Sequence, residues 1–277
     1  MRVPYIIASL ALCSSAALMA AGSPSPKQEH IGHALQAAVA APNRSTANKA
    51  RDIYRHPVET LSFFGIKPTD TVVEIWPGGG WYTEILAPYL RDHGKLIVAA
   101  PAGRGAEGIA RFLDTDPKSY AQVARANFPT LLGGTPVAPG TADAVLTFRN
   151  VHNWRMGTFV PYAQDYSTAA FQELYAMLKP GGVLGIEDHR LPEDASDERE
   201  RQSGYIKVST IRRLAEQAGF KFVGASEVNA NPKDTKDYPK GVWTLPPRLA
   251  EGDVDRAKYL AIGESDRMTL KFVKPMR

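Results

Sequence analysis

A strand that runs into a glycine-rich bend and then a helix is the feature that most restricts how this chain can fold. Residues 72–86 read VVEIWPGGGWYTEIL. The β-forming residues before Trp76 favour a buried strand, and the segment after the glycines has a helical pattern. Because glycine lacks a Cβ atom, a bend at residues 78–80 lets a ligand approach the backbone closely. The stretch predicts the start of an α/β domain with a binding site at the bend.

Strands and helices alternate through the rest of the chain. We predict strands at residues 71–76, 95–100, 142–150, 181–188, 221–228 and 266–275, and helices at 81–92, 106–115, 169–179 and 208–220. This alternation predicts a mostly parallel, doubly wound α/β sheet with helices on both faces. No helix separates the last two strands, so we expect an antiparallel pair with an insertion at residues 229–263. A solvated loop is the default interpretation of this insertion, and a lid or substrate loop is the alternative.

The N-terminus has the pattern of a secretory signal peptide. Arg2 precedes an apolar run, residues 6–21, which small residues follow. The run is shorter than the ~20 residues of a membrane-spanning helix, so an uncleaved anchor is the weaker interpretation. We therefore expect an exported, periplasmic protein without stable membrane insertion. Its expected parts are a signal peptide at residues 1–22, a polar leader or linker at 23–45 and a domain at 46–277.

The composition argues against a nucleic-acid partner. The 33 Lys and Arg residues against 29 Asp and Glu give a net charge of only +4, without a basic block. Hydrophobic residues make up 44% of the chain, which is enough for a core. The single cysteine, Cys13, lies in the predicted signal peptide, so the mature domain would hold no disulfide and no thiolate metal site.

Three classes of ligand bind at a bend of this kind. A mononucleotide P-loop needs GxxxxGK[ST], and no Lys-Ser or Lys-Thr follows here. A dinucleotide loop needs GxGxxG; Gly78 and Gly80 fit its first two positions, but Thr83 takes the third. The second strand also ends in VAAPAG, without an acidic residue for a ribose hydroxyl. S-adenosylmethionine has no phosphate and needs an acidic residue in the strand, here Glu74, beside a glycine-rich bend.

Four motifs in order resemble one protein family. VVEIWPGGGWYTEILAPYL, ADAVLTFRNVHNW, LKPGGVLGIEDHR and ESDRMTLKFVKP are similar to those of a bacterial, often exported group of predicted class I S-adenosylmethionine-dependent methyltransferases. The upstream RDIYRHPVETLSFFGIKPTD matches the same group, and the resemblance covers most of residues 48–275. It implies a Rossmann-like class I methyltransferase fold, whose last strand is antiparallel. It also implies S-adenosylmethionine as cofactor and a small-molecule acceptor.

The resemblance further implies that the bend faces the cofactor. The candidate cofactor-binding residues are Glu74, Gly78, Gly79, Gly80, Trp81 and Asn150. Ligand approach is the preferred interpretation of the glycines, whereas packing is the simpler one for Trp81. One feature departs from the family pattern. Ala99, Ala100 and Pro101 stand where class I enzymes usually carry an acidic residue for the ribose.

Polar side chains at the ends of two later strands are candidate catalytic groups. In FRNVHNW, His152 is the natural general base near neutral pH, and Asn153 can orient an acceptor. A structural histidine bonded to a carbonyl is the alternative for His152. In IEDHR, Asp188 and His189 are expected to line the acceptor pocket. A metal bound with Glu187 is less favoured, because the spacing shows no ligand code, and we expect no metal.

The segment RDIYRHP precedes the first strand. Pro57 is expected to begin a new helix, because proline suits a first turn better than an interior. The preceding charges at Arg51, Asp52, Arg55 and His56 can close over the site, although a surface helix with ion pairs is slightly favoured.

Two other functions stay open alongside methyl transfer. One is a degenerate, exported domain that binds a ligand or partner without turnover. The other is a nicotinamide-dependent oxidoreductase, against which Thr83 and the missing acidic residue argue.

Overall fold

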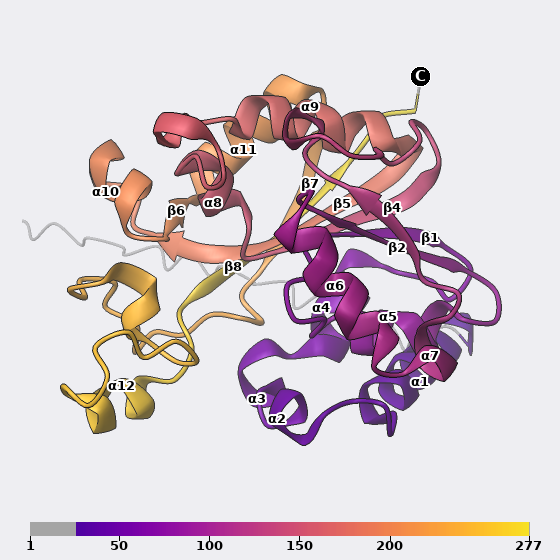
Figure 1. The fold of residues 1–277 in the computed structure, drawn as a ribbon, viewed down its shortest axis with the longest axis horizontal. Coiled ribbons are helices and arrows are strands. Elements are labelled where there is room, and N and C mark those ends of the chain that lie inside the picture. Colours follow the sequence, from indigo (N-terminus) through magenta and orange to yellow (C-terminus); the bar gives the residue numbers. More distant parts are fainter. Residues whose placement is uncertain (1–25, 277) are drawn as a thin grey trace, which may run out of the picture.

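Parallel strands flanked by helices make up most of the described chain, as Figure 1 shows. The computed structural model describes residues 26–276, so the predicted signal peptide lies outside the described residues. The strands are β1 (Thr71–Ile75), β2 (Lys95–Ala100), β3 (Ala124–Asn127), β4 (Ala142–Phe148), β5 (Leu178–Leu191), β6 (Ile206–Lys207), β7 (Lys221–Ser226) and β8 (Arg267–Val273). Their order is β3-β2-β1-β4-β5-β8-β7, and β6 pairs with β5.

Helices connect the strands. They are α1 (Pro26–Ala40), α2 (Thr46–Lys49), α3 (Asp52–Arg55), α4 (Pro57–Phe64), α5 (Thr83–Leu90), α6 (Arg104–Asp114), α7 (Pro117–Tyr120), α8 (Val151–Arg155), α9 (Ser167–Met177), α10 (Asp197–Gln202), α11 (Val208–Ala218) and α12 (Arg256–Ile262). Short 3-10 helices are η1 (Thr130–Leu132), η2 (Pro161–Ala163) and η3 (Gly241–Thr244).

Each face of the sheet has its own apolar core. On one face, α1, α4 and α5 bury Leu35, Leu61 and Ile85. On the other face, α8 and α9 bury Trp154 and Phe171. In Figure 1 the strands lie between α9 and α11 above and α1, α4 and α5 below. Successive strand residues alternate between the two cores, as the pleat of a strand requires.

The predicted strand directions are confirmed in outline. β1, β2, β3, β4 and β5 are parallel, and β8 is antiparallel to both β5 and β7. Pro57 is the first residue of α4, as expected from its fixed backbone angle. The sequence did not predict β3, a half-exposed edge strand of four residues with little apolar pattern. The strand expected to reach Asn150 ends at Phe148, and the chain turns into α8.

The described part of the expected leader is folded onto the domain. Residues 26–40 form α1, and its Leu35 and Ala38 are buried against α4 and α5. The sequence predicts a short helix at residues 31–40 within a polar leader, and α1 covers that stretch and completes one of the two cores. Within residues 26–276, no helix combines the length and the apolar character needed to cross a membrane.

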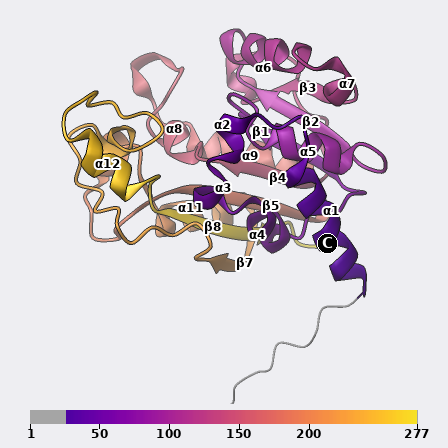
Figure 2. The same ribbon diagram turned by 90° about the horizontal axis from the view of Figure 1, so that it is seen from below.

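The carboxyl ends of β1 and β4 are adjacent, so the segments that follow these two strands lie next to each other. The glycine bend follows β1, and Arg149 and Asn150 follow β4. Figures 1 and 2 both place the segment that carries α12, within the 229–263 insertion, at the opposite side of the molecule from α7. A site at this edge can be built from the bend and the end of β4.

Candidate active site

A pocket of about 250 Å³ lies at the glycine bend. Its lining comes from the bend, the end of β4 and the segment that contains α3. Of the predicted cofactor-binding residues, the pocket includes Glu74, Gly78, Gly79, Trp81 and Asn150. The structure thus brings together five residues that the sequence spreads over nearly eighty positions.

The three glycines of the bend have different surroundings. A Cβ atom on Gly78 or Gly79 would meet no atom within 4 Å, so both leave open space over the backbone. Gly78 also has a φ of 58°, which favours glycine. Gly80 does not line the pocket, and a Cβ atom there would lie 2.4 Å from the ring of Phe112. This differs from the predicted cofactor contact, because Gly80 makes room for α6 instead.

Glu74 is a buried carboxyl at the base of the pocket. It is 2% exposed, and the Thr83 hydroxyl donates a hydrogen bond of 2.7 Å to its Oε2. Burial raises the pKa of Glu74 to about 7, although the Thr83 hydrogen bond and the charge of Arg149 oppose the shift. The group can therefore change its protonation state near neutral pH.

Trp81 and Asn150 line the pocket and also contact the segments around it. The Trp81 indole donates to the Asn48 carbonyl at 3.1 Å, and the guanidinium of Arg55 lies 4.7 Å from its ring centroid. The Asn150 side-chain nitrogen donates to the Ile75 carbonyl at 2.9 Å and so joins the ends of β4 and β1. Both side chains are held in place without a ligand.

His152 and Asp188 form a buried hydrogen-bonded pair. The His152 Nδ1 lies 2.7 Å from Asp188 Oδ1, and the His152 backbone N–H donates to Oδ2 at 3.2 Å. His152 is 3% exposed and Asp188 is fully buried. An aspartate that accepts from Nδ1–H leaves the lone pair of the imidazole on Nε2, as a general base requires.

His189 joins this pair, whereas Asn153 does not. The His189 ring centroid lies 5.1 Å from that of His152, and its Nδ1 lies 2.5 Å from the Ser265 hydroxyl. Burial, followed by the charges of His152 and of nearby arginines, holds the pKa of His189 well below its usual range. Asn153 instead donates to the Arg149 carbonyl at 3.4 Å.

Ligand atoms of His152, Asp188 and His189 lie within 4.8 Å of one another. The hydrogen bonds of Asp188 to the His152 ring and to the His189 backbone N–H explain this closeness. The expectation of no metal stays a prediction. The pocket lining includes Arg149 and Asn150 but none of these three residues.

Glu187, considered from the sequence only as a metal ligand, is the centre of a buried charge network. It is fully buried and accepts from the Tyr82 hydroxyl at 3.1 Å, from Arg149 at 3.3 Å and from Arg267 at 3.0 Å. Arg149 has a φ of 61°, an uncommon backbone conformation for a residue with a side chain. This turn aims its guanidinium at Glu187 and into the pocket.

Glu264 is the second carboxylate of the network. It accepts from Arg51 at 2.6 Å, from Arg55 at 3.1 Å and from Arg267 at 3.1 Å. Burial alone would raise the pKa of Glu264, but Arg55, Arg267 and Arg51 lower it to about 2. Arg51 and Arg55 line the pocket, so the surface helix slightly favoured from the sequence is wrong for them. Arg51 is the N-cap residue of α3 and Arg55 is its last residue, and the sequence named both as charges that can close over the site.

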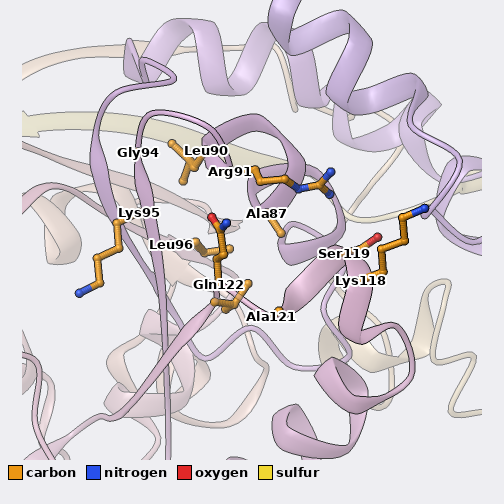
Figure 3. Close-up of a pocket in the computed structure, with 11 residues that line it drawn as sticks. Ala87, Leu90, Arg91, Gly94, Lys95, Leu96, Lys118, Ser119, Ala121 and Gln122 are labelled. Atoms are coloured by element: carbon orange, nitrogen blue, oxygen red, sulfur yellow. The ribbon is translucent and has the colours of Figure 1, made fainter.

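A further pocket of about 90 Å³ lies at the opposite edge of the sheet. Figure 3 shows its lining, which includes Lys95 at the start of β2 together with Arg91 and Lys118. It lies at the amino end of a strand, where a doubly wound sheet does not bind its main ligand.

Comparisons with known proteins bear on the fold. No protein-family model and no curated protein matches the sequence. A SAM-dependent methyltransferase from Aquifex aeolicus has a TM-score of 0.54 at 16% identity, over 81% of this chain and 93% of that chain. A putative sarcosine dimethylglycine methyltransferase from Galdieria sulphuraria has a TM-score of 0.54 at 12% identity, over 83% and 85%. The [4+2]-cyclase SpnF has a TM-score of 0.53 at 14% identity, over 91% and 95%. The chain therefore has the Rossmann-like fold of class I methyltransferases, with an antiparallel strand near the C-terminal end.

Proposed function

We propose that this protein is an S-adenosylmethionine-dependent methyltransferase that acts on a small molecule. The observation that carries the proposal is the open cradle at Gly78 and Gly79, at the carboxyl edge of a class I methyltransferase fold. A structural neighbour, phosphoethanolamine N-methyltransferase 2 of Haemonchus contortus, was solved in complex with S-adenosyl-L-methionine. It has a TM-score of 0.52 at 16% identity, so it supports the fold and makes the cofactor a reasonable proposal.

The residues around the bend fit the methionine end of this cofactor. Gly78 and Gly79 leave room above the backbone, and Glu74 and Asn150 present polar groups beside it. When bound, the cofactor supplies a methyl group activated by its sulfonium. The protein's contribution is to align the acceptor with that methyl group and to exclude water.

His152 is the proposed general base. Asp188 holds the imidazole through Nδ1, which leaves Nε2 to take a proton from the acceptor. His189 and Asn153 are proposed to shape the acceptor side of the site. Because Asp188 is fully buried, it is expected to orient the imidazole and stabilise its protonated form.

The test is a calorimetric titration of residues 23–277 with S-adenosylmethionine and S-adenosylhomocysteine. We expect micromolar binding, and we expect Gly79→Val to abolish it, because the new side chain fills the cradle without a strained φ. Gly108→Val is the matched control, since a Cβ atom at Gly108 in α6 also meets no atom within 4 Å. Equal affinity in Gly79→Val and wild type would remove the bend from the site.

A second candidate function is ligand binding on the same fold without methyl transfer. Two observations favour it: Ala100 and Pro101 end β2 where a ribose-binding acid is expected, and the likeness to the cyclase SpnF shows that this fold serves other chemistry. No heat with either ligand, from a folded sample, would favour this candidate. A titration with NAD tests the oxidoreductase alternative.

Export to the periplasm is proposed from the sequence of residues 1–22 alone. The N-terminal sequence of protein recovered from a periplasmic extract tests it. A new N-terminus near residue 23 is expected, and an intact Met1 in a cytoplasmic fraction would contradict the proposal.

A further inference from the structure

The charged side chains that line the pocket and the buried ones that contact them carry more positive than negative charge. Four guanidinium groups converge on two carboxylates, and the residues involved are Arg51, Arg55, Arg149, Arg267, Glu187 and Glu264. Glu74 adds little negative charge below neutral pH, since burial raises its pKa to about 7. An uncompensated buried charge is costly, so a surplus of this kind indicates a missing anion.

The hydrogen bonds show where this anion belongs. Arg55 donates to Glu264 through Nε, and among residues 26–276 its two terminal nitrogens make no hydrogen bond. Arg149 donates to Glu187 only through Nη1, again among the described residues. The Nη2 of Arg51 is buried and has no partner in the same part of the chain. The carboxylates therefore hold Arg55 and Arg149 through part of each guanidinium, and the N–H groups without a hydrogen bond in the described chain belong to residues that line the pocket.

Arg55 and Arg149 also repel one another. The side chain of Arg55 is 4% exposed, and that of Arg149 is 20% exposed. Burial, followed by the charge of Arg149, lowers the pKa of Arg55 to about 9. The left-handed backbone of Arg149 and the stacking of Arg55 on Trp81 keep the two groups in this arrangement. An anion between them would relieve the repulsion.

The proposed cofactor does not balance this charge, although its methionine end carries a carboxylate. S-adenosylmethionine carries a sulfonium, an ammonium and a carboxylate, so it brings a net positive charge to a pocket that is already positive. A second ligand with negative charge would offset both. The unused N–H groups belong to the end of β4 and to α3, next to the segment that contains His152.

We propose that the acceptor carries a carboxylate or phosphate group, which the guanidinium groups of Arg55 and Arg149 bind. The anion site itself is inferred from the arginines alone. The assignment of the anion to a methyl acceptor rests on the proposed function. Forked N–H donors match the paired oxygens of both groups. The same charges predict that the anion and S-adenosylmethionine bind with positive cooperativity.

The experiment titrates inorganic phosphate, at constant ionic strength, into the wild type and the variants Arg55→Gln and Arg149→Gln. Saturable binding is expected in the wild type, and each substitution should weaken it by about tenfold or more, the usual effect of losing a charge-assisted hydrogen bond. Arg111→Gln is the matched control, because Arg111 lies on α6 with a side chain 72% exposed. Arg55→Lys and Arg149→Lys keep the positive charge beside each partner carboxylate. Each should weaken phosphate binding less than the matching glutamine variant does.

A parallel titration with S-adenosylhomocysteine and 5′-methylthioadenosine separates the sources of the anion. If the anion belongs to the acceptor, each arginine substitution should change the affinities for the two compounds by the same factor. If the arginine variants no longer bind S-adenosylhomocysteine but still bind methylthioadenosine, which lacks the amino-acid part, the arginines hold the cofactor's carboxylate and the acceptor proposal is wrong.

The phosphate titration has its own contrary outcomes. If the wild type shows no saturable phosphate binding, or if Arg111→Gln weakens that binding equally, the anion site is wrong. Phosphate binding without S-adenosylhomocysteine binding would support the anion site and reject the proposed methyltransferase function.

Discussion

At the scale of single residues, the role of His152 depends on its hydrogen-bond partner in the fold more than on its being a histidine. A histidine bonded only to a carbonyl would be structural. Here the bond goes to Asp188, at 2.7 Å, and both side chains are buried. This arrangement is the one that prepares an imidazole to accept a proton at Nε2.

His152→Ala is therefore expected to lower turnover by about 10²–10⁴-fold, the usual contribution of a general base, with little change in cofactor affinity. Transfer of a radiolabelled methyl group to an acceptor found by screening small-molecule extracts measures turnover, and calorimetry measures affinity. His93→Ala is the control, because His93 is exposed in the loop before β2. An equal loss of turnover and affinity would make His152 a structural residue.

The sequence indicated some of these residues and not others for a physical reason. Gly78 and Gly79 were predictable because a strand, a bend and a helix are adjacent in the chain. Arg149 was not predicted and Arg55 was only the less favoured alternative, because their contacts are to Glu187 and Glu264, which are 38 and 209 residues away. Local patterns carry no information on such pairs, so Arg55 looked like a surface residue.

At the scale of elements, the packing of α6 on the glycine bend explains the third glycine. Gly80 has a φ of 79°, and a Cβ atom there would overlap the ring of Phe112. Both α6 and the bend were predicted from the sequence. Their contact was not, because helix periodicity shows which face is buried but not which residue it meets.

Gly80→Ala is expected to destabilise the fold by about 2–4 kcal/mol, from backbone strain and overpacking together. Urea unfolding monitored by circular dichroism measures the change. In a Phe112→Ala background the same substitution should cost about 1–2 kcal/mol, since only the backbone strain remains. Additive effects in the double variant would show that Phe112 does not determine the need for glycine.

At the scale of the whole molecule, buried ion pairs join the segment before β1 to the segment before β8. Arg51 and Arg55 contact Glu264, and Arg267 reaches the Tyr54 carbonyl. The segment that follows the insertion therefore holds two arginines that line the pocket. The alternation of strands and helices predicted the sheet, but not this contact between the two ends of the domain.

Glu264→Gln is expected to destabilise the protein by about 3–5 kcal/mol at pH 7, because three arginines lose a buried partner. Against the effect of burial, the neighbouring arginines lower the pKa of Glu264 from its usual 4.5 to about 2 in the fold. A depressed carboxyl pKa stabilises the fold above pH 4.5, and this contribution of about 3 kcal/mol disappears as the pH falls toward 2. The difference between wild type and variant should shrink over that range in urea unfolding experiments.

Glu107→Gln is the control for this prediction. Glu107 forms an exposed pair with Arg111 at 3.9 Å on α6, and such pairs contribute less than about 1 kcal/mol. Its effect should be small and nearly independent of pH. A pH-independent effect of Glu264→Gln would show that packing rather than charge carries the contact.

The pairing of Arg55 with Glu264 also has a consequence for biosynthesis. Arg55 leaves the ribosome 209 residues before its partner, so this ion pair cannot form until nearly the whole chain has been made. Sheet strands from β1 to β5 can assemble earlier, since domains begin to fold from the N-terminal side during synthesis. A nascent chain therefore lacks the partner that holds Arg55 at the pocket until translation has nearly ended.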